Sequence, residues 1–335
     1  MRWKSRNRST SRNQEVTENV DTETVGRSSG YENWMELLPA DRQNLPLSQL
    51  IIPGSHNSGA YSLCLSRIGC DVPKFLRTLS TPPLRRIVHR WSECQRLSVA
   101  DQLKLGCRYF DFRVAPRPLD EVLVAVHGLY GPSFREILQG IRDFLRANSK
   151  EIVILDFNHF YSITGDMHRQ LMQLLVDSFG DLLCPYPGPL APWPSLSQMW
   201  ARHHRVIVIY HCVQSVAAYG NNMFWPSTVI RAPWADTPNI SSLISFLEFN
   251  LTQRVLAHAR LYVIQGIVTI QLRGLLYRLG LIGSLRNMSK SATKAVLKWL
   301  QQLPKEYLAL VNIVLADFID DWDFCHRVID LNYLR

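Results

Sequence analysis

The sequence has few of the features that would place a protein outside the cytoplasm. The first residues are polar and charged, without the apolar segment of a secretory signal peptide. The chain also lacks an uninterrupted apolar run of about 18 residues, the length that a spanning helix needs. Its seven cysteines are odd in number and lack the paired spacing of a metal site. We therefore expect a cytoplasmic protein with reduced thiols and no membrane-spanning segment.

Acidic residues are scarce in two long stretches. The chain has 37 Lys and Arg against 28 Asp and Glu, a net charge of +9. Residues 72–92 and 249–305 are basic and contain no acid, and the nine basic residues of the second stretch equal the whole net charge. This balance predicts an anionic partner, although each stretch is as easily explained as a solvated helix face. No nucleic-acid motif or stacking platform appears, so we expect no nucleic acid as partner.

The chain divides into a polar tail and a globular body. Residues 1–30 have almost nothing to bury and are predicted to be a disordered tail. Residues 31–335 contain short apolar runs, rich in Val and Ile and mostly not alternating, which is typical of buried parallel strands. These runs are Gln49–Ile52, Arg108–Val114, Glu121–Val126, Glu151–Phe157, Arg205–Tyr210, Arg260–Ile264 and Leu310–Ala316.

Helical patterns lie between several of these runs. Ser133–Asn148, Met167–Phe179 and Ser291–Leu303 each place apolar side chains on one face at helical spacing. Alternating strands and helices over this length favour a single α/β domain of the (β/α) barrel type.

Polar residues cluster where the predicted strands end. The ends carry His56 and Asn57, Asp111 and Arg113, His127, Asp156 and Asn158, His211, and Asp317. Each has an ordinary explanation: an isolated His is usually a loop or core residue, Asp111 and Arg113 share a strand face and could pair, and Asp317 could cap a helix. In a barrel, however, all these strand ends open onto one mouth, where active sites are built.

Two histidines and an arginine at one site suit phosphoryl transfer. One imidazole can accept a proton from an attacking hydroxyl and the other can donate to the leaving oxygen. A guanidinium stabilises charge on the non-bridging oxygens, and a carboxylate such as Asp317 fixes the tautomer of one imidazole.

The order of the motifs resembles a known family. PGSHNSG, GCRYFDFRVA, a strand ending in VHG, EIVILDFNHFY, APWAD and NIVLADFID together resemble the X domain of phosphatidylinositol-specific phospholipase C, in the standalone X-domain proteins of animals. The resemblance covers about residues 31–335 and implies an irregular TIM-type barrel.

The resemblance also implies a role for each site residue. His56 matches the general base for the inositol 2-hydroxyl, Asp317 its acidic partner, and His127 the general acid for the diacylglycerol oxygen. Arg113 matches an arginine that bacterial members place against the phosphate, and Asp111 matches a carboxylate of the active-site network. Asn57, Asn158 and His211 fall at substrate-binding positions, His211 in place of an arginine.

Departures from the family pattern bear on metal use. The multidomain eukaryotic enzymes hold Ca²⁺ with an Asn and several carboxylates, which Asn57 and Asp111 match only in part. Arg113 and Asn158 replace the other acidic ligands, and a hard cation requires several anionic oxygens. We therefore expect Ca²⁺-independent chemistry without a cofactor.

The implied partner is an anionic phospholipid membrane that carries an inositol phospholipid substrate. Trp225, Trp234 and the Leu-rich segment 271–285 follow strands and suit an interfacial rim, although packing on barrel helices explains Trp225 equally well. The Lys290, Lys294 and Lys298 stripe is interpreted as a solvated helix face. We expect a monomeric, cytoplasmic phospholipase C peripheral at membranes. A weakly active or inactive lipid-binding signalling module on the same barrel is the alternative, because Asn57 replaces a bacterial Asp and Asn158 a bacterial basic residue.

Overall fold

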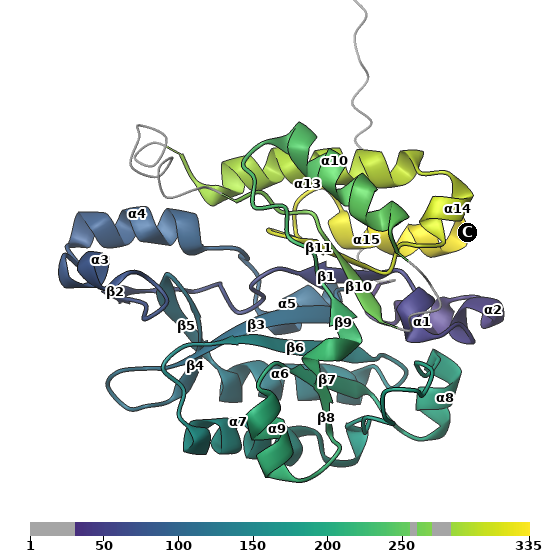
Figure 1. Cartoon of the computed structure of the whole chain (residues 1–335), viewed down its shortest axis with the longest axis horizontal. Coiled ribbons are helices and arrows are strands. Elements are labelled where there is room, and N and C mark those ends of the chain that lie inside the picture. The colour runs from purple at the N-terminus through teal and green to yellow at the C-terminus, as the bar shows by residue number, and fades with distance from the viewer. Residues whose placement is uncertain (1–30, 255–259, 270–282) are drawn as a thin grey trace, which may run out of the picture.

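Eight parallel strands curve into a barrel in the computed structural model, which describes residues 31–254, 260–269 and 283–335 (Figure 1). Their order around the barrel is β9-β10-β11-β1-β3-β6-β7-β8, and no pairing among the described strands joins β8 to β9. Their bounds are β1 (Ile52–Ser55), β3 (Tyr109–Pro116), β6 (Val153–Phe160), β7 (Val206–Tyr210), β8 (Phe224–Pro226), β9 (Ile230–Arg231), β10 (Leu261–Gln265) and β11 (Ile313–Ala316). The barrel is therefore irregular.

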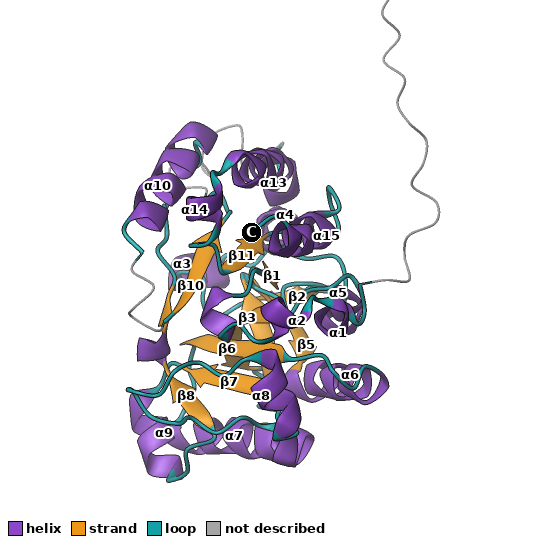
Figure 2. Ribbon diagram, turned by 90° about the vertical axis from the view of Figure 1, so that its right-hand side faces the viewer, coloured by secondary structure: helices purple, strands orange, loops and turns teal. Residues whose placement is uncertain are grey.

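Helices cover the outside of the barrel (Figure 2). The longer ones are α4 (Pro82–Ser92), α6 (Phe134–Ala147), α7 (Gly165–Phe179), α10 (Ile240–Thr252) and α13 (Leu285–Gln302). Shorter ones are α1 (Trp34–Leu37), α2 (Ala40–Gln43), α3 (Lys74–Thr78), α5 (Val99–Lys104), α8 (Leu196–Ala201), α9 (Val213–Tyr219), α14 (Lys305–Leu308) and α15 (Phe324–Asp330). Short 3-10 turns, η1 (Leu47–Gln49), η2 (Gly180–Leu182), η3 (Ser227–Val229) and η5 (Leu331–Tyr333), join them. The predicted tail, residues 1–30, lies outside the described residues.

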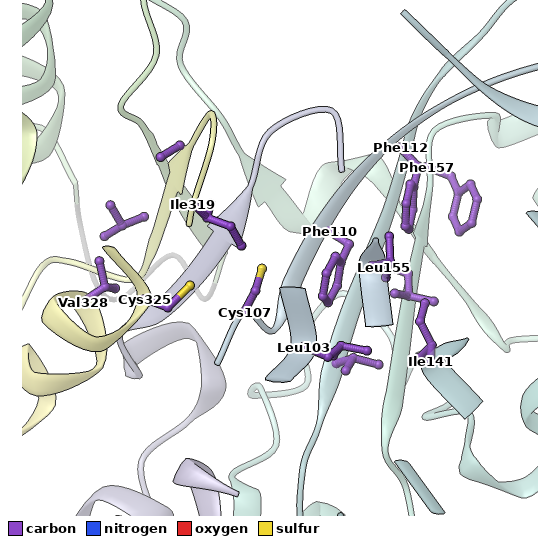
Figure 3. Close-up of a cluster of buried hydrophobic side chains, with 14 of the residues drawn as sticks. Leu103, Cys107, Phe110, Phe112, Ile141, Leu155, Phe157, Ile319, Cys325 and Val328 are labelled. Atoms are coloured by element: carbon purple, nitrogen blue, oxygen red, sulfur yellow. The ribbon is translucent and has the colours of Figure 1, made fainter. Parts of the chain in front are cut away.

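The three predicted helices form: α6 and α7 lie within two residues of their expected bounds, whereas α13 begins six residues earlier than expected, at Leu285. In α6, Ser133 accepts a hydrogen bond from the Glu136 backbone N–H while the Glu136 carboxylate accepts from the Ser133 N–H, a capping box that fixes where the helix begins. The apolar face of α6 packs on the outer face of β3 and β6, where Phe110, Phe112 and Leu155 lie (Figure 3). The helical periodicity thus correctly indicated which face is buried.

Side chains alternate between the outer and inner faces of the barrel wall. Along β7, Val206 and Val208 belong to the outer apolar cluster, whereas Ile207 and Ile209 belong to the cluster inside the barrel. Continuing each inward register by two residues leads to the polar strand ends: Ile52-Gly54-His56, Tyr109-Asp111-Arg113, Ile154-Asp156-Asn158, Ile207-Ile209-His211 and Ile313-Leu315-Asp317. We call the end of the barrel where these residues lie the barrel mouth. The gathering of these polar residues there therefore follows from strand periodicity.

Two predicted strands differ from the structure. The first strand begins where Gln49–Ile52 was expected to end, because η1 occupies Leu47–Gln49. It includes Gly54, where a Cβ atom would lie 2.8 Å from Tyr109 Cδ1. Glu121–Val126 was predicted as a parallel strand, and this is wrong: β4 (Leu123–His127) pairs antiparallel with β3, with Val114 opposite Ala125. Apolar runs do not reveal strand direction.

The β4 hairpin brings a residue back to the mouth. Strand β3 continues beyond the barrel to Pro116, and β4 returns along it and ends at His127. Strands β5 (Leu129–Ser133) and β2 (Cys64–Ile68) extend this hairpin, so that β2, α3, α4 and β5 lie together at one side of the molecule (Figure 1).

A buried ion pair joins the opposite end of the barrel. Arg108 Nε donates to Glu151 Oε2 over 2.7 Å, and both side chains are fully buried. The same guanidinium donates to the Leu103 and Glu32 carbonyl oxygens, and Glu151 Oε1 accepts from the Met35 N–H. The pair thus fastens α1 to the N-terminal ends of β3 and β6.

Replacing Glu151 with Gln is expected to lower the free energy of unfolding by about 3–5 kcal/mol, because the buried Arg108 charge loses its counter-ion. Urea unfolding measures this change. Asp143→Asn is the matched control, since Asp143 pairs with Arg146 on the exposed surface of α6, and its loss should shift stability by less than about 1 kcal/mol. Equal destabilisation in the two variants would contradict the assignment.

Candidate active site

The barrel mouth brings two imidazoles face to edge. The rings of His56, which follows β1, and His127, which ends β4, lie with centroids 6.3 Å apart at an interplanar angle of 71°. The two residues are far apart in sequence, and only the barrel with its β3–β4 hairpin brings them together. The predicted pair of histidines therefore shares one site.

A carboxylate fixes the tautomer of His56. Its Nδ1 lies 2.7 Å from Asp317 Oδ1, and the Ser289 hydroxyl donates to Asp317 Oδ2 over 3.1 Å. Because a carboxylate only accepts, Nδ1 carries the proton, and the lone pair lies on Nε2, which is 3.1 Å from Asn57 Nδ2. That nitrogen is placed to accept a proton from a bound hydroxyl.

His127 is oriented by a backbone carbonyl instead. Its Nδ1 donates over 2.7 Å to the carbonyl oxygen of Ser92, which is the last residue of α4. Burial, followed by the positive charge of Arg113, lowers its pKa from 6.5 to about 3. The imidazole is therefore neutral at physiological pH, and it becomes a proton donor only when an anion raises its pKa.

An anionic ligand bound beside Arg113 would have this effect. Its charge would neutralise Arg113 and interact directly with the imidazolium, reversing one cause of the low pKa. Raising the pKa of His127 from about 3 to near neutrality requires about 5 kcal/mol of such interaction.

Asp111 is held by amide donors. Its Oδ2 accepts from the Asn57 backbone N–H over 3.0 Å, and its Oδ1 accepts from Asn158 Nδ2 over 2.5 Å. Burial opposes ionisation, but the charges of His56 and Arg113 and these hydrogen bonds outweigh it, so the pKa of Asp111 lies below its ordinary value. Asp111 is thus an anion within 3.9 Å of His56 Nε2.

Asn158 lies at an irregularity in the pairing of β3 with β6. Phe112 lies opposite Phe157, whereas Arg113 lies opposite His159, so Asn158 is the extra residue. A β-bulge cannot be predicted from the apolar pattern, although the pattern did place Asn158 at the strand end.

Arg113 and Asn57 each have one buried polar atom without a hydrogen-bond partner among the described residues. Arg113 Nε and Asn57 Oδ1 are buried and have no hydrogen-bond partner within the part of the chain that the structure describes. A buried donor and a buried acceptor of this kind are costly unless something binds them. An anionic oxygen can accept from Arg113 and a hydroxyl can donate to Asn57.

His211 lies across the mouth beside a carboxylate. Its Nε2 is 2.8 Å from Asp156 Oδ1, and the Tyr109 hydroxyl donates to Asp156 Oδ2 over 2.6 Å. Burial lowers the pKa of His211, but the hydrogen bond and charge of Asp156 outweigh it and raise the pKa above its ordinary value. Asp156 therefore favours the protonated form of His211.

Sequence reasoning missed several residues of this site. Cys94 is fully buried beside both histidines, and Gln95 Nε2 donates to the carbonyl oxygens of His56 and Ala316. Both lie in the connection after α4, with no strand or motif to mark them. Ser289 on α13 reaches Asp317 from a helix that sequence analysis treated only as barrel cover.

The predicted interfacial rim is only partly described. Trp225 is buried, stacks on Trp193 and donates to the Cys184 carbonyl oxygen, so the interpretation as an interfacial residue is wrong and that of packing is correct. Trp234 is 53% exposed. Most of 271–285, including Arg273 and Arg278, lies outside the described residues.

The basic stretch 249–305 is used partly inside the fold. Arg254 donates to the carbonyl oxygens of Leu310 and Ser48, and burial lowers its pKa to about 10. Arg286 pairs with Asp321 over 3.2 Å. Lys294 lies 4.9 Å above the Trp322 ring on an exposed helix face. The stretch therefore does not act as one free positive surface.

Comparisons with known proteins agree with this geometry. The family model "Phosphatidylinositol-specific phospholipase C, X domain" matches residues 87–211. The chain is 36% identical to mouse (Mus musculus) PI-PLC X domain-containing protein 2 over 308 residues, which cover 90% of this chain and 88% of that protein. The chain belongs to this family. It is also 34% identical to the human (Homo sapiens) PI-PLC X domain-containing protein 3, covering 90% of this chain and 94% of that protein.

Solved structures confirm the predicted irregular TIM-type barrel. A phosphatidylinositol-specific phospholipase C from Listeria monocytogenes aligns with a TM-score of 0.66 at 17% identity, covering 90% of this chain and 98% of that one. One from Staphylococcus aureus aligns with a TM-score of 0.59 at 16% identity, covering 91% and 98%. At these identities the likeness concerns the fold alone. Within the described residues, 31–254, 260–269 and 283–335, no helix combines the length and apolar character needed to span a bilayer.

The X-domain site of this chain does not fit the Ca²⁺ of the multidomain members. Both oxygens of Asp111 already accept from amide donors, and the Arg113 guanidinium stands two residues along the same strand. Asn158 supplies an NH₂ group to Asp111 where a ligand carboxylate would be needed. A hard cation requires several anionic oxygens, and this set offers one. Calcium independence remains a prediction that an assay must test.

Proposed function

We propose that this X-domain protein is a phospholipase C that cleaves phosphatidylinositol-type lipids at membranes without a metal ion. The observation that carries the proposal is the pair of oriented histidines, 6.3 Å apart, beside the unpartnered guanidinium nitrogen of Arg113. Such an arrangement suits a phosphodiester placed between a proton acceptor and a proton donor.

In the proposed reaction, His56 Nε2 takes the proton of the inositol 2-hydroxyl. The freed oxygen attacks phosphorus, and the bond between phosphorus and the diacylglycerol oxygen breaks. His127, protonated once the substrate anion is bound, gives its proton to that oxygen. Arg113 stabilises the negative charge on the non-bridging oxygens, and Asp317 stabilises the imidazolium that forms on His56. The products are diacylglycerol and inositol cyclic phosphate.

One observation favours a second candidate. The low pKa of His127 leaves the free protein without a ready proton donor, which suits a weakly active or inactive lipid-binding module on the same barrel. Vesicles of phosphatidylinositol separate the two functions. Release of diacylglycerol by the wild type and its loss in His56→Ala support the enzyme, whereas vesicle binding without release in either protein supports the module.

We further propose that α3 and α4 contact an anionic phospholipid surface. Phe75 and Leu79 are 58% and 60% exposed, and Lys74, Arg77 and Arg86 around them are exposed and basic. The Gly69 N–H donates to the Gly128 carbonyl oxygen, next to His127, so this unit borders the barrel mouth. Apolar side chains ringed by basic ones are typical of a surface that lies in the headgroup region.

The variant Phe75→Ser/Leu79→Ser is expected to bind anionic vesicles at least tenfold more weakly, because two apolar side chains no longer enter the interface. Sedimentation with vesicles measures the binding. Leu190→Ser is the matched control, since Leu190 is 97% exposed on the loop before α8, away from the mouth. Equal losses in both proteins, or none in either, would show that lipid binds elsewhere.

A further inference from the structure

Cys94 has surroundings unlike those of the other fully buried cysteines. Cys107 and Cys325 lie within the main apolar cluster (Figure 3), whereas Cys94 belongs to a smaller apolar cluster with Trp91 and Phe318, and its sulfur faces polar groups of the barrel mouth. It lies 3.4 Å from His127 Nδ1 and accepts from Asn57 Nδ2 over 3.5 Å. Two side chains of the barrel mouth, His127 and Asn57, therefore contact this thiol.

Three different metal-binding groups meet at this point. One ligand atom each from His56, Cys94 and Asp317 lies within 4.8 Å of the others. Two of these residues belong to strand ends, and the third comes from the connection after α4. An imidazole nitrogen, a sulfur and a carboxylate oxygen form a mixed donor set that Zn²⁺ prefers and that Ca²⁺ and Mg²⁺ do not.

We propose that His56, Cys94 and Asp317 form a Zn²⁺ site that holds the protein in an inhibited form. The ion would reach the site through the mouth, where the His56 side chain is 12% exposed, while Cys94 is fully enclosed. Binding replaces the thiol proton by Zn²⁺, so one proton leaves for each ion bound.

The inhibitory effect rests on the proposed function, whereas the binding does not. Zn²⁺ held between His56 and Asp317 would bind His56 Nδ1, the nitrogen that faces Asp317, and displace the proton of this atom. The ring proton then lies on Nε2, which can no longer accept the proton of the inositol hydroxyl.

The test measures metal binding directly. Full-length protein freed of metal is titrated with Co²⁺, whose bond to a thiolate gives a charge-transfer absorption band, and Zn²⁺ is then added to displace it. We expect one equivalent to bind to the wild type, and affinity to fall by more than about 100-fold in Cys94→Ala, because a direct ligand is lost. Cys64→Ser, which removes an exposed thiol on β2, should bind as the wild type does.

Circular dichroism and thermal unfolding show whether Cys94→Ala is folded, and His56→Ala provides a second variant that leaves the thiol in place. Weaker binding in both variants supports the site. Unchanged Zn²⁺ affinity in both, no binding by the wild type, or a thiolate band lost only in Cys64→Ser would overturn it. If the metal binds as expected but the wild type never releases diacylglycerol, the Zn²⁺ site stands and the phospholipase proposal fails.

Discussion

The His127→Ala variant is expected to lose a factor of about 10²–10⁴ in turnover of phosphatidylinositol, the range that a general acid contributes. The diacylglycerol oxygen leaves as a poor alkoxide unless it receives a proton. His127 is the imidazole whose Nδ1 is fixed by the Ser92 carbonyl oxygen, which directs its Nε2 away from α4. Its removal should therefore slow cleavage of the bond to the lipid, with less effect on lipid binding.

A change of leaving group tests whether His127 acts as the general acid. An inositol phosphodiester with a nitrophenol leaving group departs without protonation, so His127→Ala should be almost as active on it as the wild type. His56→Ala should stay inactive on both substrates, because the 2-hydroxyl proton must still be removed. His326→Ala is the matched control, since His326 stacks on Tyr31 at the opposite end of the barrel. Equal losses of His127→Ala on both substrates would contradict a general-acid role.

Replacing Arg113 with Ala is expected to lower turnover by about 10²–10³, as removal of one group that stabilises developing charge commonly does. The Nε atom of Arg113 is buried and has no hydrogen-bond partner among the described residues, so this atom can donate to a phosphoryl oxygen. Arg113→Lys keeps the charge but loses the fork geometry, and we expect it to recover only part of the activity.

The same variant should alter His127 in the absence of substrate. Because the Arg113 charge is one cause of the low pKa of His127, Arg113→Ala should raise that pKa from about 3 toward its ordinary value. Histidine resonances followed by NMR during a pH titration measure this shift. A pKa of His127 that stays unchanged in Arg113→Ala would show that burial alone sets it, and the predicted coupling through the phosphate would fail.

Strand periodicity explains how much of the site the sequence could predict. Inward-facing residues recur every second position, so extending β1, β3, β6, β7 and β11 past their apolar parts leads to polar residues at a common mouth. This rule correctly placed His56, Asp111, Arg113, His211 and Asp317 together. It also indicated His127, but on the wrong assumption that its strand is a parallel strand of the barrel. Strand β4 instead runs antiparallel to β3 and ends at the mouth.

The remaining features depend on tertiary structure. Cys94, Gln95 and Ser289 enter the site from a connection and a helix, where no periodicity marks them. For Trp225 the sequence left interfacial contact and packing equally open, because a Trp after a strand can pack inward as easily as outward, and here it stacks on Trp193. The basic stretch 249–305 predicted an anionic partner or a solvated helix face, but burial of Arg254 and the Arg286–Asp321 pair remove part of its charge from solvent.

Product analysis of the wild-type protein on phosphatidylinositol vesicles in excess EDTA tests the central claim most directly. The account predicts that diacylglycerol and inositol cyclic phosphate appear together in EDTA, at a rate that added Ca²⁺ does not increase, and that His56→Ala forms neither product. Release that EDTA abolishes and Ca²⁺ restores, or release that persists unchanged in His56→Ala, would contradict it.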